Sequence, residues 1–335
     1  MMNRFNNKSI FFFGDSITNG GAFLAQLRGY FLENNQHVAV YNKGIGGARA
    51  DMLRYLLAEE LSFFKPDYAV LSYGVNDLGI WLYRSGEQLS QAQEDEKEKR
   101  IEIYAESVLL AVRELKQRDI IPIICSPFCV NKDIVEREDI QTVGDNKEKA
   151  GLIDDCFYKK DTFKNINGGL ARLRECSLKI AQDEGVEFWD LLEITLRDAD
   201  ADCFISDGIH YTKKGHCVIA NGILQCMGYL DCVREKYDYT EIKEIDIVEQ
   251  DMRAYFFCKY TLLEIKDGNI SVEDTKKLLK EFYDRNGYIN GLNETRLNGF
   301  FRFIENIKEN VAQLNKKLKL VHYQKQLIRK RLMSY

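Results

Sequence analysis

The chain has 335 residues, which is enough for one large domain or for a main domain with an appendage. Its net charge of −5 is mild, so we do not expect nucleic acid as the main partner, and no apolar run is long enough to cross a bilayer. The nine cysteines are scattered and the four histidines do not cluster with them, so we expect reduced thiols, no metal site and no cofactor. Because no secretory signal precedes the first predicted strand, the expected location is cytoplasmic.

The first predicted strand is Ile10–Phe13, an apolar run typical of the centre of a parallel sheet. Gly14 ends this strand, and Asp15 and Ser16 then precede a predicted helix at 22–32. Ligands of open α/β sheets bind outside the carboxyl ends of the strands. A serine at this position, near the positive end of a helix, is therefore well placed to attack a carbonyl group. The alternative is that Asp15 or Ser16 only caps the helix.

Strands and helices alternate through the next two hundred residues. The further predicted strands are 37–42, 68–73, 120–125 and 185–190. The further predicted helices are 52–61, 94–115, 161–184 and a last one that ends near Tyr229, with His216 expected on its surface. We expect an irregular segment at 78–93 and a polar excursion over the carboxyl edge of the sheet at 127–160. Such alternation predicts a parallel sheet with helices on both faces.

The alternation stops near residue 231, which predicts a main domain at 1–230 and a helical extension of unknown role at 231–335. Residues 310–335 keep an apolar three-to-four spacing and hold seven Lys or Arg but no Asp or Glu. We interpret them as a basic amphipathic helix that packs on the body of the protein. The alternative is that this helix binds a partner helix, mediates self-association or meets an anionic surface.

Four polar segments call for a joint explanation: Gly14-Asp15-Ser16, the glycine-rich loop that ends at Gly47, Gly74-Val75-Asn76-Asp77, and Asp207-Gly208-Ile209-His210. Acyl transfer by a serine requires a base, an acid that orients the base, and donors for the oxyanion. On one helical turn Asp207 and His210 share a face, so the carboxylate could hold one ring nitrogen while the other faces Ser16. The backbone N–H groups of Ser16 and Gly47 and the amide of Asn76 are the candidate oxyanion donors.

These four segments, in this order, resemble the motifs of the SGNH (GDSL-type) hydrolases, and the resemblance covers residues 8–229. It implies a flavodoxin-like three-layer α/β sandwich with a five-stranded parallel sheet. It also implies that Ser16 is the nucleophile, His210 the general base and acid, and Asp207 the residue that orients it. By the same resemblance, Gly47 and Asn76 line the oxyanion hole together with the Ser16 amide. Gly46 is adjacent to Gly47, but the spacing from Asn42 favours Gly47.

Five residues near these motifs are weaker candidates for substrate binding: Asp15, Arg49, Asp77, Trp81 and Tyr83. Asp15 is more simply interpreted as a brace for the turn, and Asp77 either supports the site or caps a helix. The other three are equally typical of packing or of surface groups.

The expected function is a serine esterase that hydrolyses O-acyl esters through an acyl-enzyme. The expected substrate is a small-molecule or carbohydrate ester with a small acyl group, and acetyl on a carbohydrate is preferred because many members of the resembling family act on it. One alternative is an O-acyltransferase that passes the acyl group to a sugar hydroxyl. Another is a binding or assembly protein whose catalysis is weak.

Overall fold

The computed structural model of the chain describes residues 3–62, 65–84, 88–132, 160–205, 207–229, 271–273 and 276–277. The chain divides into two compact units, and the first consists of Met1–Glu138 and Asp155–Tyr237. Nearly all of the described residues belong to this first unit, and only these are discussed below. The predicted extension at 231–335 falls outside the described residues except for five of them, so its helical character and the boundary at 230 stay predictions.

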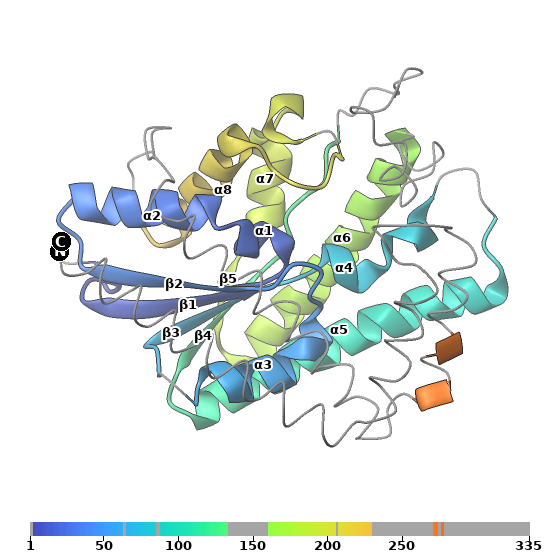
Figure 1. The fold of residues 1–335 in the computed structure, drawn as a ribbon, viewed down its shortest axis with the longest axis horizontal. Coiled ribbons are helices and arrows are strands. Elements are labelled where there is room, and N and C mark those ends of the chain that lie inside the picture. Colours follow the sequence, from blue (N-terminus) through green and yellow to red (C-terminus); the bar gives the residue numbers. More distant parts are fainter. Residues whose placement is uncertain are drawn as a thin grey trace, which may run out of the picture. The chain divides into compact units, whose positions relative to one another are not determined.

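A five-stranded sheet forms the centre of the first unit (Figure 1). Its strands are β1 (Lys8–Gly14), β2 (Val38–Gly44), β3 (Tyr68–Ser72), β4 (Ile121–Cys125) and β5 (Glu187–Trp189). They pair in parallel in the order β2-β1-β3-β4-β5, which is the flavodoxin-like order. The predicted α/β fold is therefore confirmed, and each predicted strand matches an observed one within two residues at either end.

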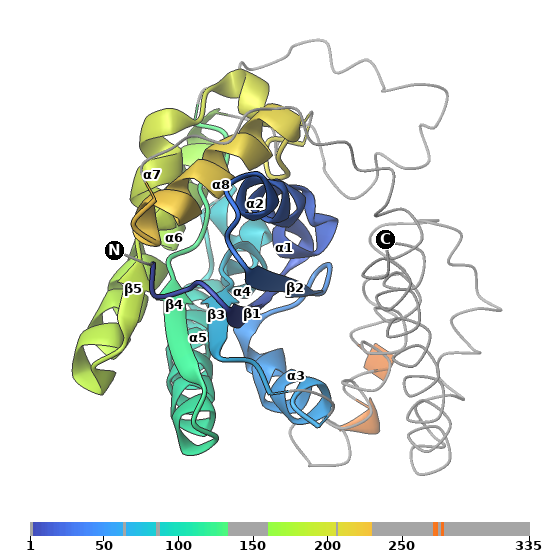
Figure 2. The same cartoon turned by 90° about the vertical axis from the view of Figure 1, so that its left-hand side faces the viewer.

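Helices cover both faces of the sheet (Figure 2). On one face lie α2 (Ala22–Glu33) and α8 (Lys213–Cys226), and on the other lie α3 (Leu53–Glu60) and α5 (Gln91–Gln117). The long helix α6 (Lys160–Glu184) packs beside α5. The apolar run of β1 is buried between these layers, as a central parallel strand requires. Within the described residues, no helix combines the length and the apolar character needed to span a membrane.

The main departure from the predicted elements lies between β3 and α5. The short helix α4 (Val75–Leu78) follows β3, and the short helix η2 (Ile80–Tyr83) lies within the segment at 78–93 that is predicted to be irregular. The helix α5 begins at Gln91, before the charged run, because Ser90 and Gln93 form a capping box. These local hydrogen bonds carry no apolar period, so the hydrophobic pattern placed the helix start three residues too late.

The prediction that His216 lies on the helix surface is wrong. Only 8% of the surface of His216 is exposed. Its ring stacks on Phe23 of α2, with 6.1 Å between the ring centroids and 17° between the ring planes. The physical reason is its position in α8, three and seven residues before the buried Ile219 and Ile223. That spacing places the imidazole on the apolar face of the helix.

Candidate active site

Ser16 stands at the point where β1 turns into the short helix α1 (Ser16–Gly20). A Cβ atom at Gly14 would lie 2.2 Å from Thr18 Oγ1 and 2.7 Å from the Ser72 carbonyl oxygen, so only glycine fits at the end of this strand. Asp15 then caps α1, because its Oδ1 accepts a hydrogen bond of 2.9 Å from the Ile17 amide. The turn thus fixes Ser16 as the first residue of the helix, at the carboxyl edge of the sheet.

The structure brings Ser16, His210 and Asp207 together, although Ser16 and His210 are 194 positions apart in the chain. His210 Nε2 lies 2.8 Å from Ser16 Oγ, and His210 Nδ1 lies 2.6 Å from Asp207 Oδ2. With the imidazole neutral and its proton on Nδ1, Nε2 is free to accept the serine hydroxyl proton. These contacts form the chain of hydrogen bonds from hydroxyl to imidazole to carboxylate that nucleophilic catalysis by a serine requires.

A tight turn, not the helical turn considered from the sequence, presents Asp207 and His210. Asp207 Oδ1 accepts hydrogen bonds of 2.8 Å from both the Ile209 and the His210 amides. Gly208 adopts a left-handed conformation with φ of +67°, which a residue with a side chain rarely takes. One carboxyl oxygen of Asp207 therefore shapes the turn while the other binds the imidazole.

The segment that follows β4 holds this turn in place, which the sequence did not reveal. The Asn131 amide donates to the Gly208 carbonyl at 2.8 Å, and the Tyr211 hydroxyl donates to the Cys129 carbonyl at 2.6 Å. Tyr211 is buried next to His210 and packs on Phe128. The sequence does not reveal this role of Tyr211, because a tyrosine next to a motif is equally typical of ordinary core packing.

The electrostatics of the pair favour proton transfer to the imidazole. The hydrogen bond with Asp207 is the main reason why the pKa of His210 lies above its usual 6.5, although burial works in the opposite direction. Burial alone would raise the pKa of Asp207, but its hydrogen bonds from His210 and Ile209 hold that pKa below its usual value. Asp207 is therefore ionised at neutral pH, and its charge favours the protonated form of the His210 ring.

The residues predicted for the oxyanion hole lie on α4 and on the loop after β2. Asn76 is half-buried, and its Nδ2 donates to the Ala48 carbonyl at 3.1 Å. Asp77 Oδ1 accepts a hydrogen bond of 2.8 Å from the Ala50 amide, so α4 holds the loop at two points. A side-chain amide has two N–H groups, and the bond to Ala48 uses one of them. Gly47 precedes Ala48 and has a left-handed φ of +76°.

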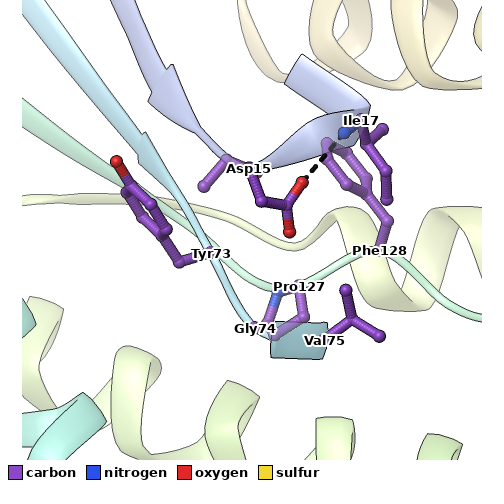
Figure 3. A pocket seen from close by; sticks show the side chains of 8 residues that line it. Asp15, Ile17, Tyr73, Gly74, Val75, Pro127 and Phe128 are labelled. Atoms are coloured by element: carbon purple, nitrogen blue, oxygen red, sulfur yellow. Dashed lines mark hydrogen bonds between the residues drawn. The ribbon is translucent and has the colours of Figure 1, made fainter. Parts of the chain in front are cut away.

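Asp15 is almost fully buried, with 3% of its surface exposed, and its carboxylate faces a small cavity (Figure 3). This cavity has room for about one water molecule. Its lining residues are Asp15, Ile17, Ser72, Tyr73, Gly74, Val75, Pro127 and Phe128. Burial raises the pKa of Asp15 to about 6, against the lowering effect of the Ile17 amide and of His210. The predicted role of Asp15 as a brace for the turn agrees with its hydrogen bond to Ile17.

The other three candidates for substrate binding do not line this cavity. Arg49 forms a bidentate pair with Asp51, with 2.6 Å from its Nη2 to Asp51 Oδ2. Trp81 is 50% exposed, and the Arg100 guanidinium lies 4.7 Å from its ring centroid. Tyr83 is buried, with the Lys97 ammonium 4.9 Å from its ring. Among them, Trp81 alone presents a large apolar surface to solvent.

Comparison with known proteins adds an independent observation. The model of the GDSL-like lipase/acylhydrolase family matches residues 12–218, which include Ser16, Asn76, Asp207 and His210. A search of curated proteins found no match.

Three similar solved structures come from different sources. An acetylxylan esterase from Geobacillus stearothermophilus is 19% identical with a TM-score of 0.48, and the match covers 70% of this chain and 99% of that one. The enzyme LAE5 from the metagenome of Lake Arreo, described as an alpha/beta hydrolase, is 18% identical with a TM-score of 0.49, covering 69% of this chain and 100% of that one. A lipase/acylhydrolase from Enterococcus faecalis is 16% identical with a TM-score of 0.44, covering 68% and 99%.

Proposed function

The chain belongs to the GDSL-like lipase/acylhydrolase family and is a hydrolase of ester bonds, and from this premise we propose that Ser16, His210 and Asp207 form its catalytic triad. The observation that carries the proposal is the pair of short contacts from Ser16 Oγ through the His210 ring to Asp207, at 2.8 Å and 2.6 Å. A serine that only capped a helix would need neither contact.

The first half of the reaction forms an acyl-enzyme. Ser16 Oγ attacks the ester carbonyl carbon while His210 Nε2 takes the hydroxyl proton. The carbonyl electron pair moves onto oxygen, and the Ser16 amide, the Gly47 amide and the Asn76 Nδ2 donate to this oxyanion. When the tetrahedral intermediate collapses, the C–O bond to the alcohol breaks and His210 gives its proton to the leaving oxygen.

The second half of the reaction releases the acid. Water attacks the acyl-enzyme carbonyl while His210 takes one of its protons, and the same donors hold the second oxyanion. Collapse breaks the bond to Ser16, whose Oγ receives the proton back from His210. Throughout, Asp207 keeps the imidazole in one orientation through the hydrogen bond at Nδ1.

Our proposed substrate is a small acyl group, with acetyl on a carbohydrate preferred. The turn-rich edge of the sheet around Ser16 supports a short acyl group, and the preference for acetyl on a carbohydrate follows from the family resemblance described above. The half-exposed indole of Trp81, three residues beyond the end of α4, supports a sugar as the alcohol part, because the apolar faces of sugar rings stack on such rings.

The test of the nucleophile is the variant Ser16→Ala. Without its oxygen we expect turnover of p-nitrophenyl acetate to fall by roughly four to six orders of magnitude, while the fold is retained. A fluorophosphonate probe should label the wild-type chain at Ser16 and leave the variant unlabelled. As a matched control, Ser90→Ala removes a serine hydroxyl from the start of α5 and should leave labelling unchanged. Normal turnover in Ser16→Ala would refute the proposal.

The size of the acyl group is tested by p-nitrophenyl esters of increasing chain length. We expect kcat/KM to be highest for acetyl and to fall for longer chains, because the proposed substrate carries a small acyl group. A rise with chain length would contradict the proposed substrate and would favour lipid-like esters. Product analysis with and without a sugar acceptor separates hydrolysis from the predicted alternative of acyl transfer.

A further inference from the structure

The segment 126–131 follows β4 and runs through the interior beside the active site. All six of its residues are buried, although none of them lies in a helix or a strand. Near one end Pro127 lines the cavity shown in Figure 3, and at the other end the Asn131 amide donates to the Gly208 carbonyl at 2.8 Å. Because Gly208 belongs to the turn at 207–210, the position of this segment bears directly on the position of that turn.

A buried segment without regular structure needs partners for its backbone N–H and C=O groups, and side chains supply several of them here. The Cys129 amide donates to Thr195 Oγ1 of α7 (Leu191–Asp198) at 3.1 Å. The Cys129 carbonyl accepts from the Tyr211 hydroxyl at 2.6 Å. Because an unpaired polar group is costly in the interior, each of these bonds opposes a displacement of the segment.

The next residue, Val130, is held by Asn167 of α6, whose carboxamide pairs with both of its backbone groups. The Val130 amide donates to Asn167 Oδ1 at 3.0 Å, and Asn167 Nδ2 donates to the Val130 carbonyl at 3.0 Å. A carboxamide is chemically a peptide group, so this pair resembles two strand residues that exchange both of their hydrogen bonds. Val130 is only 1% exposed, so water competes little for these bonds.

These contacts form a continuous path from α6 to the acid and the base of the proposed triad. Asn167 holds Val130, the following residue is Asn131, and the amide of Asn131 donates to the carbonyl of Gly208. A change at position 167 therefore reaches the chemistry as a displacement of the turn at 207–210. Displacing a catalytic group by about 1 Å is enough to cost about a hundredfold in rate.

We propose that Asn167 is a positioning residue of the active site, whose carboxamide fixes Val130 and thereby holds the Asn131 amide against the turn that carries Asp207 and His210. The proposal rests on the proposed function insofar as His210 is the general base of the reaction. It gives α6, which contributes no residue to the proposed triad, a defined part in the geometry of the site.

The first test measures kcat and KM for p-nitrophenyl acetate in Asn167→Ala and Asn167→Asp, with rates taken per folded chain as measured by circular dichroism. Alanine removes both bonds to Val130, whereas aspartate keeps the acceptor and loses the donor. We expect kcat to fall in both variants, by about ten- to a hundredfold with alanine, because the imidazole is misplaced for proton transfer. The KM should change by less than about threefold, because the binding of the ester does not depend on that transfer.

Ser177→Ala is the matched control, because it also removes a buried hydrogen bond from α6, the one of 2.8 Å to the Tyr104 hydroxyl of α5. It should lower the free energy of unfolding in urea but leave kcat within about twofold of the wild-type value. A wild-type kcat in either Asn167 variant, or an equal loss of kcat in Ser177→Ala, would overturn the proposal.

The second test needs no turnover and follows hydrogen exchange of single amides by NMR. In Asn167→Ala, exchange should become faster at the amides of Asn131, Ile209 and His210 and stay unchanged in β1. Unchanged exchange at these three amides, or an equal acceleration throughout the sheet, would refute the positioning role. This readout does not involve Ser16, so its failure is distinguishable from a failure of the proposed triad, which an active Ser16→Ala variant would reveal.

Discussion

At the scale of single residues, Asn76 connects the architecture of the site to its chemistry. One N–H of its amide is occupied by the Ala48 carbonyl, and this bond fixes the direction of the other. The same contact ties α4 to the loop that carries Gly47, so two of the proposed oxyanion donors are positioned by one hydrogen bond. A donor that is fixed before substrate arrives needs no reorganisation during the reaction.

We therefore predict that Asn76→Ala lowers kcat for p-nitrophenyl acetate by about a hundred- to a thousandfold, because one oxyanion donor is lost. The KM should change less, because the oxyanion forms only in the transition state. Asn165→Ala serves as the control, since it removes a comparable bond to the Tyr83 carbonyl, at 3.3 Å. A kcat near the wild-type value in Asn76→Ala would remove this residue from the oxyanion hole.

At the scale of elements, α8 docks on α2 through the buried imidazole of His216. Burial lowers the pKa of His216 to about 4, so the ring is neutral in the folded protein above that pH. In the unfolded chain the same group binds a proton near pH 6.5. Between these two values the unfolded state binds more protons, and stability is lost as the pH falls from 6.5 towards 4.

The variant His216→Phe tests this linkage, because phenylalanine keeps an aromatic ring against Phe23 but cannot bind a proton. Between pH 7 and pH 5 the wild-type chain should lose about 2 kcal/mol of unfolding free energy that the variant does not lose. Urea unfolding of both proteins at the two pH values measures the difference. Parallel changes in the two proteins would show that His216 is not the group responsible.

The elements differ in how far the sequence could specify them. The continuous apolar runs of β1 and β3 predicted parallel strands that are buried on both faces, because a strand with one face in solvent would alternate between apolar and polar residues. Both strands are found as expected. The helix α4 and the turn at 207–210 were not predictable from periodicity. With four residues α4 is too short to show a period, and hydrogen bonds to the Asp207 side chain define the turn. His216 was misplaced because its neighbours Lys213, Lys214 and Gly215 are typical of a solvated helix end.

The sequence likewise predicts some parts of the candidate site and not others. Motif order led to Ser16, Asp207 and His210, and the structure places these three side chains within hydrogen-bonding distance. The support from the segment after β4 was not predictable, because Asn131 acts through its backbone amide and Tyr211 through a contact with a distant carbonyl. Backbone donors leave no trace in residue identity. Arg49, Trp81 and Tyr83 lie near the motifs in the sequence, but proximity in sequence does not determine whether a side chain reaches the cavity.

At the scale of the whole molecule, the first unit closes on itself at the end of the strand–helix alternation. Tyr229 packs on Tyr30 and Phe31 of α2, with ring centroids 5.5 Å and 5.6 Å apart. We predict that a chain ending after Tyr229 folds and hydrolyses p-nitrophenyl acetate at a rate close to that of the full chain. Circular dichroism and turnover measure this, and an inactive or insoluble product would assign residues 230–335 a part in the fold or the site.

A chain that ends at Thr212 is the matched control, since it also lacks α8 with the buried Ile219, Ile223 and Leu224. Loss of these side chains removes several kcal/mol of apolar burial, so this shorter chain should not fold. If it folded and retained activity, the division at Tyr229 would have no structural meaning.

The long separation in sequence between Ser16 and His210 affects the order of events in folding. Because 194 positions separate them, the reactive pair exists only after nearly the entire first unit has been assembled around the sheet. Closing so long a loop is slow and comes late in folding. The return of esterase activity therefore reports the last step of folding. On dilution from denaturant, secondary structure should return well before the first ester is cleaved.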